Sequence, residues 1–212
     1  LNGADFVSVP LTIRTETEEF RDDASLDVDA MVSTLRSTRG RSYSACPNVA
    51  DWESAFGESG DVIAFTITSS LSGSYNAACV AGKNCTERNP ARRIHVVHNL
   101  AQNGRISRLT ATMAGVLGIR AAGQASAEGT LEMLGKCRGG RKTQHFMLCE
   151  MERLGYGGGS VRIGHCQNEA FAQELCTGIR QRFPAADVRC DPLRGLCSYY
   201  AERGGIMLGF ET

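Results

Sequence analysis

The sequence has no surplus of charge and no long apolar run. Lysine plus arginine and aspartate plus glutamate both number 23, so the formal net charge at pH 7 is zero. Nucleic acids and anionic membrane surfaces attract clustered positive charge, which a balanced chain does not supply. No stretch approaches the roughly 20 consecutive apolar residues that cross a bilayer. We therefore expect neither a nucleic-acid-binding protein nor stable insertion into a membrane.

The short motifs of common catalytic sites are also lacking. The chain has no G-x-S-x-G, no H-E-x-x-H, no Walker loop and no G-x-G-x-x-G. Residues 157–159 are three glycines, but they lack the strand-then-helix context of a phosphate-binding loop. The four histidines are scattered along the chain, and each is more simply explained as a structural residue. These motifs give no indication of an enzyme.

Closely paired cysteines are absent, although cysteine itself is plentiful. The nine cysteines form no C-x-x-C pair, and most lie in apolar, periodic stretches. An odd number of cysteines in such stretches indicates reduced, buried thiols in a cytoplasmic protein. His165 and Cys166 come nearest to a metal-ligand pair, but they lie in a strand-like run that we interpret as core. We expect no metal site and no cofactor.

The pattern of apolar residues predicts an α/β protein. Asp27 is a predicted N-cap, and Asn48 followed by Asp51 predicts a second helix start. The predicted strands are 6–13, 61–68, 94–97, 161–165, 187–190 and 206–210. The predicted helices are 27–38, one that starts at 48, 106–117, 141–154 and 168–183. We expect a β-ribbon at 119–137, a loop or irregular ribbon at 14–25 and a loop at 191–205. With 212 residues the chain is long enough for two small domains, and we place the boundary between residues 1–97 and 98–212.

A cluster of hydroxyl groups follows the apolar strand at 61–68. The cluster includes Ser69, Ser70, Ser72 and Gly73, and helical spacing begins directly after it. In open α/β sheets, ligands bind where a strand ends and a helix begins. The hydroxyls could simply cap the helix, or they could bind an anion together with its first N–H groups. Because no lysine or arginine lies in the turn, the second alternative favours a small, weakly charged oxyanion rather than a polyphosphate.

The strand at 94–97 lacks a crossover. Parallel strands need a connection of about a dozen or more residues, usually a helix. Here the strand runs directly into residues 98–106, which show no helical pattern. Either the connection is naturally short or a segment has no counterpart in this sequence.

Several motifs in a fixed order resemble the DegV family of bacterial fatty-acid-binding proteins. In chain order they are Val-Pro-Leu-Thr-Ile at 9–13, Ser-Ala-Cys-Pro at 44–47, the run from Ser69 to Tyr75, Asn-Gly-Arg-Ile-Ser at 103–107 and Gly-Gly-Ile-Met-Leu-Gly-Phe at 204–210. The resemblance covers nearly the whole chain. It implies two α/β domains with a lipid tunnel between them, and a cytoplasmic protein that carries one long-chain fatty acid.

The resemblance also implies roles for particular residues. The fatty-acid carboxylate would bind Ser44 and the hydroxyl-rich turn. Arg105 would help to present the head group to a fatty acid kinase, a separate catalytic subunit that phosphorylates the bound acid. On this basis the chain is a binding subunit, with no catalytic residue and no metal, and its ligand takes the place of a cofactor.

Three features depart from the family pattern. Nothing matches the Asp-Ser-Thr-like turn that ends the family's opening strand, and the helical segment usual between residue 97 and the Gly-Arg-Ile motif has no counterpart. Tyr200 stands where many members carry a head-group histidine. A phenol donates a hydrogen bond but is a poor proton shuttle at neutral pH. Carboxylate binding is therefore expected even where kinase partnership is altered.

The alternative hypothesis is a small-molecule hydrolase or transferase. It would use Cys46 or a serine of the turn as nucleophile. A carrier is expected to be purified with lipid bound and to show no turnover by itself, whereas the enzyme would turn over a substrate.

Overall fold

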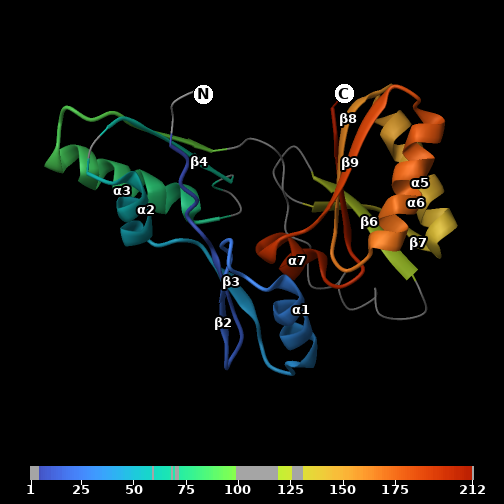
Figure 1. The fold of residues 1–212 in the computed structure, drawn as a ribbon, viewed down its shortest axis with the longest axis horizontal. Coiled ribbons are helices and arrows are strands. Elements are labelled where there is room, and N and C mark those ends of the chain that lie inside the picture. Colours follow the sequence, from blue (N-terminus) through green and yellow to red (C-terminus); the bar gives the residue numbers. More distant parts are fainter. Residues whose placement is uncertain are drawn as a thin grey trace. The chain divides into compact units, whose positions relative to one another are not determined.

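The computed structural model describes residues 5–58, 60–67, 69, 72–98, 119–125 and 131–211. Helices and strands are interspersed along the chain (Figure 1). The strands are β1 (Thr12–Arg14), β2 (Glu19–Arg21), β3 (Tyr43–Ala45), β4 (Val62–Thr66), β5 (Ile94–His98), β6 (Ile119–Ala125), β7 (Leu131–Arg138), β8 (Gly159–His165), β9 (Ala186–Pro192) and β10 (Ile206–Phe210). The helices are α1 (Val28–Ser37), α2 (Val49–Phe56), α3 (Ser74–Arg88), α5 (Gly140–Arg153), α6 (Glu169–Arg182) and α7 (Gly195–Ala201).

The chain divides into two compact units, in agreement with a two-domain α/β protein. Unit 1 holds the described residues within 1–26, 40–106 and 125–132, and unit 2 holds those within 27–39, 107–124 and 133–212. Helix α1 therefore belongs to unit 2, although it lies early in the sequence. The boundary that we place after residue 97 stays a prediction, because residues 99–118 lie outside the described residues.

In unit 1, the parallel strands β4 and β5 are joined by helix α3. Their register pairs Val62 with Ile94 and Thr66 with His98. Helices α2 and α3 pack against each other. Their shared core with the strands contains Trp52, Phe56, Ala64, Ala78, Ala81 and Cys85. Small residues on α3 allow close packing of the two helices and the strand.

The helix starts predicted at Asp27 and at Asn48 are confirmed. Asp27 Oδ1 accepts a hydrogen bond from the Ala30 N–H at 2.9 Å at the start of α1. Asn48 and Asp51 form a reciprocal capping box at the start of α2. Both pairs satisfy backbone donors that have no partner within their own helix.

Strand β4 is buried on one face only. Ala64 and Thr66 are buried, but Ile63 is 57% exposed and Phe65 is 70% exposed. The alternation follows from the pleat of the strand, which sends successive side chains to opposite faces. Among the described residues, helices cover only the face that carries Ala64.

A small antiparallel sheet completes unit 1. Its strand order is β2-β1-β3, and Ile13 pairs with Phe20 on one side and with Ser44 on the other. The predicted strand at 6–13 is wrong over most of its length, because only Thr12 and Ile13 belong to β1. Pro10 lacks a backbone donor for a sheet ladder. The predicted loop at 14–25 also contains a regular strand, β2.

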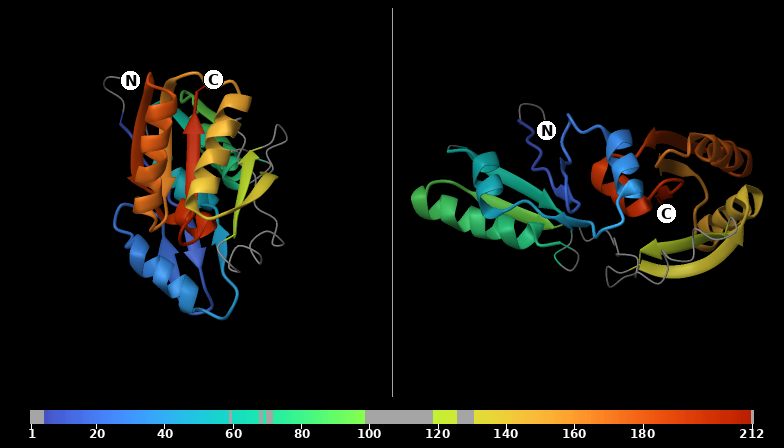
Figure 2. Two further views of the ribbon diagram at one scale, coloured as in Figure 1. Left: turned by 90° about the vertical axis from the view of Figure 1, so that its right-hand side faces the viewer. Right: turned by 90° about the horizontal axis from the view of Figure 1, so that it is seen from below.

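Unit 2 is built on a three-stranded sheet with the order β10-β8-β9. Strands β8 and β9 are parallel and are connected through α6, and β10 is antiparallel to β8. Helices α5 and α6 lie side by side over one face of this sheet (Figure 2). Strands β6 and β7 form a separate ribbon, as the sequence predicted for residues 119–137.

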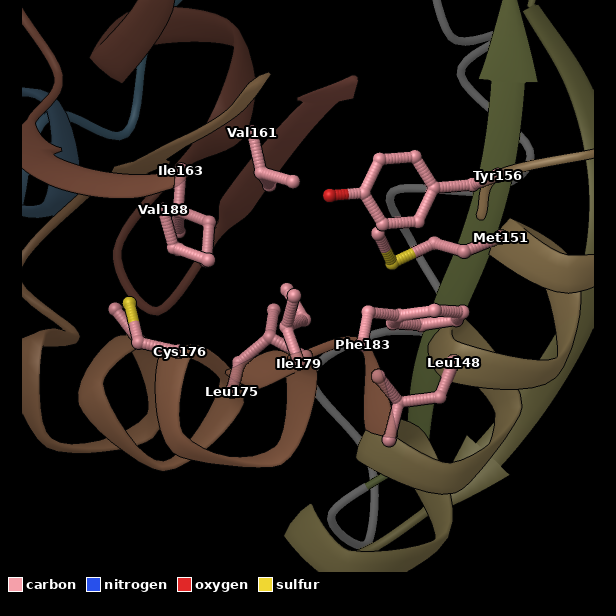
Figure 3. Packing of buried hydrophobic residues seen from close by; sticks show 11 residues of the cluster. Leu148, Met151, Tyr156, Val161, Ile163, Leu175, Cys176, Ile179, Phe183 and Val188 are labelled. Carbon is pink, nitrogen blue, oxygen red and sulfur yellow. The ribbon is translucent and has the colours of Figure 1, made fainter. Parts of the chain in front are cut away.

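The core of unit 2 lies between this sheet and its helices. Leu175 and Ile179 of α6 point toward Val161 and Val188 of the sheet (Figure 3). The Tyr156 ring makes an edge contact with the Phe183 ring, with centroids 4.9 Å apart, and its hydroxyl donates to the Gly159 carbonyl. Burial raises the pKa of the Tyr156 phenol. The hydrogen bond to Gly159 satisfies the Tyr156 hydroxyl at the edge of an apolar cluster.

Helix α7 is a helix that the sequence failed to predict. Residues 191–205 were expected to be a loop, but Gly195–Ala201 is helical. Ser198 is almost fully buried and donates a hydrogen bond to the Leu193 carbonyl at 2.9 Å. Helix α7 packs against α1. In a seven-residue helix that buries a serine, too few apolar residues recur at helical spacing for the sequence to predict it.

Candidate functional site

Two of the segments predicted to bind a carboxylate meet in unit 1. A Cβ atom built on Gly73, at the start of α3, would lie 3.0 Å from Cys46 Sγ. Cys46 directly follows β3, which carries Ser44. The backbone of the turn therefore approaches the Ser44–Pro47 segment at a distance that a larger residue at position 73 would make too short. The distance between Ser44 and Ser69 themselves stays a prediction.

Buried hydroxyls lie where α3 begins. The Ser72 and Ser74 hydroxyl oxygens are 2.9 Å apart, and Ser72 Oγ also accepts a hydrogen bond from the Ser74 N–H at 3.2 Å. Gly73, the N-cap residue, contributes no side-chain cap, and the first turn contains no acidic residue. The serines therefore cap α3 only in part. With no acidic residue in this first turn, the positive end of the helix dipole suits an anionic ligand.

Of the other predicted contacts, the structure describes Ser69 and Tyr200. Ser69 is exposed in the turn. Tyr200 lies in α7 of unit 2, partly exposed, with its ring 4.9 Å from the ring of Tyr199. Ser70 and Arg105 lie outside the described residues.

Thr66 is a candidate that sequence reasoning missed. It is the last residue of β4, it is only 7% exposed, and its Oγ1 has no hydrogen-bond partner among the described residues. Leaving a buried hydroxyl unsatisfied costs about 1–3 kcal/mol, so such groups are often satisfied by a ligand or a water molecule. A threonine at a buried position of an otherwise apolar strand was the available signal.

The alternative nucleophile, Cys46, is exposed. Within the described part of the chain, no hydrogen bond joins its thiol to a histidine or to any other base. All nine cysteines are free thiols, and Cys166 is buried, as expected for a core residue. Burial raises the pKa of the Cys166 thiol, which keeps it protonated and unreactive. No group of three potential metal ligands occurs among the described residues.

Among the described residues, no helix has both the length and the apolar character needed to cross a membrane.

Comparison with models of protein families assigns the chain to a known family. The model of the DegV family, a family described as uncharacterised, matches residues 1–98 and 94–211. The chain belongs to the DegV family. A DegV domain-containing protein of Streptococcus pneumoniae is 37% identical over 255 residues, which span 97% of this chain and 91% of that protein.

Two solved DegV structures are similar over almost their full length. A DegV family protein from Eubacterium eligens, loaded with heptadecanoic acid, is 38% identical with a TM-score of 0.86, and the match covers 98% of this chain and 93% of that one. The Fatty Acid Kinase B3 protein of Streptococcus pneumoniae, loaded with linoleic acid, is 36% identical with a TM-score of 0.87, covering 97% and 91%. The DegV fold and the similarity to fatty-acid-binding proteins, both expected from the motifs, are confirmed.

The DegV relatives also carry residues that this chain lacks. The alignment to the pneumococcal relative runs over 255 residues, whereas this chain has 212, so at least 43 aligned positions have no counterpart here. The two matches to the family model meet at residues 94–98. The strand at 94–97 lacks a crossover connection, which predicts a missing segment at this same point.

Proposed function

We propose that this DegV protein binds one long-chain fatty acid and holds its carboxylate at Ser44 and at the turn formed by Ser69, Ser70, Ser72 and Gly73. The observation that carries the proposal is the close approach of Gly73 to Cys46, because it brings the two predicted head-group segments together. Two similar DegV proteins hold heptadecanoic acid and linoleic acid, which supports the same class of ligand here.

The chemistry of the turn suits a carboxylate. A buried carboxylate must keep its hydrogen bonds or become protonated. Serine hydroxyls and the first N–H groups of α3 supply donors without a paired cation. The unsatisfied Thr66 hydroxyl, at the end of the adjacent strand, is available as one further donor. Burial of the alkyl chain contributes about 0.8 kcal/mol per methylene, so the tail supplies most of the affinity.

The proposal extends to a kinase partner. A carrier of this kind leaves phosphorylation of the bound acid to a fatty acid kinase catalytic subunit, and Arg105 and Tyr200 are the proposed contacts near the head group or the partner. The relation to the Fatty Acid Kinase B3 protein supports this role. The free thiols support a cytoplasmic location.

Native mass spectrometry of the purified protein tests lipid binding directly. We expect a bound fatty acid, or uptake of added palmitate or oleate. The substitution Ser69→Ala should weaken binding by about 1–3 kcal/mol, the cost of losing a hydrogen bond to a charged group. Ser54→Ala, which removes an exposed hydroxyl on α2, is the matched control and should bind normally. A lipid-free protein that takes up neither acid would refute the proposal, and unchanged binding by the Ser69 variant would move the head group elsewhere.

The kinase role has a separate test. Protein loaded with oleate is incubated with ATP, with and without a fatty acid kinase catalytic subunit, and acyl phosphate is measured. We expect product only when the catalytic subunit is present. Product formed by the chain alone would favour the enzyme hypothesis, which uses Cys46 or a turn serine.

A further inference from the structure

Strands β4 and β5 share an apolar surface that none of the described helices covers. Ile63 and Phe65 are exposed on β4, and Val97 on β5 is 45% exposed. The register of this parallel pair places Phe65 opposite Val97 and Ile63 opposite His95, so the exposed side chains are neighbours across the two strands. Ile67, directly after β4, extends the surface.

Helix α3 packs against the other face of β5. A Cβ atom built on Gly82 of α3 would lie 3.2 Å from Ile94 Cγ2 and 3.8 Å from Val96 Cγ2. Successive side chains of a strand point to opposite faces, so His95 and Val97 point away from α3. The exposed surface is therefore the second face of the same pair of strands.

The composition of this second face is that of a buried one. Within β4 and β5 it carries Ile63, Phe65, His95 and Val97, and no aspartate, glutamate, lysine or arginine. Parallel strands are normally covered on both faces, whereas a strand face that stays in water carries polar side chains. A contiguous apolar patch of this kind marks an interaction site.

The comparison with relatives indicates what covers this face. The alignment to the pneumococcal relative spans 255 positions and this chain has 212 residues, so at least 43 positions have no counterpart here. The two matches to the family model meet at residues 94–98, which form β5. The absent segment therefore starts at one of the two strands that carry the exposed surface.

The absent segment is long enough to cover the surface. Strands β4 and β5 have five residues each. Such a strand is about 17 Å long, and a helix of that length needs about 11 residues. The 43 positions supply this helix and connections at both ends. Connections between parallel strands are usually helices on the faces of the sheet, and α3 already occupies one face.

We propose that the apolar face formed by Ile63, Phe65, Ile67 and Val97 is the docking surface for this segment. Its occupant is an amphipathic helix that DegV relatives carry directly after the counterpart of β5. The proposal concerns the packing of unit 1, and it does not rest on the fatty-acid binding proposed above.

A chimera that carries the pneumococcal segment after His98 tests the proposal. Hydroxyl-radical oxidation of side chains is measured by peptide mass spectrometry for the chimera and for the chain itself. We expect oxidation of Phe65 to fall in the chimera to the level of Tyr156, which is buried in the core of unit 2. Tyr43, exposed on β3, is the internal reference and should be oxidised equally in both proteins.

A substitution tests directly whether the Phe65 ring becomes buried. Phe65→Thr removes the ring and keeps a residue that strands favour. In the chimera it should lower the midpoint of thermal unfolding, and in the chain itself it should leave the midpoint nearly unchanged. Val80→Thr, at an exposed position of α3, is the matched control and should be neutral in both proteins.

Several results would overturn the proposal. One is a folded chimera in which Phe65 is oxidised as fast as in the chain itself, and another is an equal effect of Phe65→Thr in both proteins. Protection of Phe65 in the chain itself by heptadecanoic acid would assign the face to the lipid. Protection in the chimera only at high protein concentration would assign it to a second copy.

Oxidation of Tyr156 would show that the chimera has not folded. The segment is then added as a synthetic peptide to the chain itself, and the same oxidation is measured. We expect the peptide to protect Phe65 and to leave Tyr43 unchanged. A peptide that leaves Phe65 unprotected would also overturn the proposal.

Discussion

At the scale of single residues, Glu53 links α2 to α3. Its carboxylate accepts a hydrogen bond from Asn84 Nδ2 at 2.7 Å and from Arg88 at 3.1 Å. The hydrogen bond from Asn84, followed by the contact with Arg88, lowers the pKa of Glu53 below its ordinary value. A carboxyl group with a lowered pKa stabilises the fold above its ordinary pKa. That stabilisation is lost as the pH falls through the lowered value.

We therefore predict a pH-dependent effect of Glu53→Gln. At pH 7 the variant should unfold at a lower temperature than the wild type, and the gap should close as the pH falls through the lowered pKa of Glu53, below which both side chains are neutral. Thermal unfolding at several pH values measures this. Glu58→Gln changes the net charge equally at an exposed position and should show no such pattern. A gap that is independent of pH would mean that the amide fails to pack, rather than that a charge is lost.

Residue-scale prediction from the sequence succeeded where the chemistry is local. The caps at Asp27 and Asn48 depend on side chains that reach only three residues along the chain, so the spacing alone predicts them. Thr66 was missed because the sequence does not show how other elements pack around its hydroxyl, which has no partner among the described residues. The geometry around Ser69 and Tyr200 depends on distant segments and stays a prediction.

At the scale of elements, the contact between the segment after β3 and the start of α3 invites a double-variant test. Gly73 has φ −66° and ψ −5°, a conformation that alanine adopts easily. Gly73→Ala should therefore be costly only through the contact of its Cβ with Cys46 Sγ. We expect a loss of stability of about 1 kcal/mol, at the low end for overpacking because the Cys46 side chain is exposed.

Adding Cys46→Ala to this variant should restore most of the loss, since it removes the sulfur. Chemical denaturation and fatty-acid binding are measured for both single variants and for the pair. Strictly additive effects would mean that the two segments do not touch in solution.

Elements whose apolar residues repeat at a regular spacing were predicted well, and elements without such a repeat were not. Helices α5 and α6 were expected at 141–154 and 168–183, within a residue or so of their bounds, because their buried residues repeat at helical spacing. The strand expected at 6–13 and the loop expected at 191–205 were wrong. In the first case, apolar residues alternate without being buried. In the second, α7 is stabilised by tertiary contacts that leave little trace in sequence.

At the scale of the whole molecule, the two units have separate cores. The cluster around Trp52 belongs to unit 1, and the cluster around Leu175 belongs to unit 2. The sequence predicted two α/β domains, and the order of motifs predicted the family. It did not predict that α1 groups with unit 2, because helix membership depends on tertiary contacts rather than on position along the chain.

The face of β4 and β5 that no described helix covers affects how the purified protein is expected to behave. Three large apolar side chains on this face are exposed to water, those of Ile63, Phe65 and Val97. Exposed apolar strand faces of this kind promote association between molecules. We predict reversible, concentration-dependent self-association in sedimentation experiments, and Phe65→Ser should diminish it. A wild-type protein that stays monodisperse at high concentration would mean that something else shields these side chains.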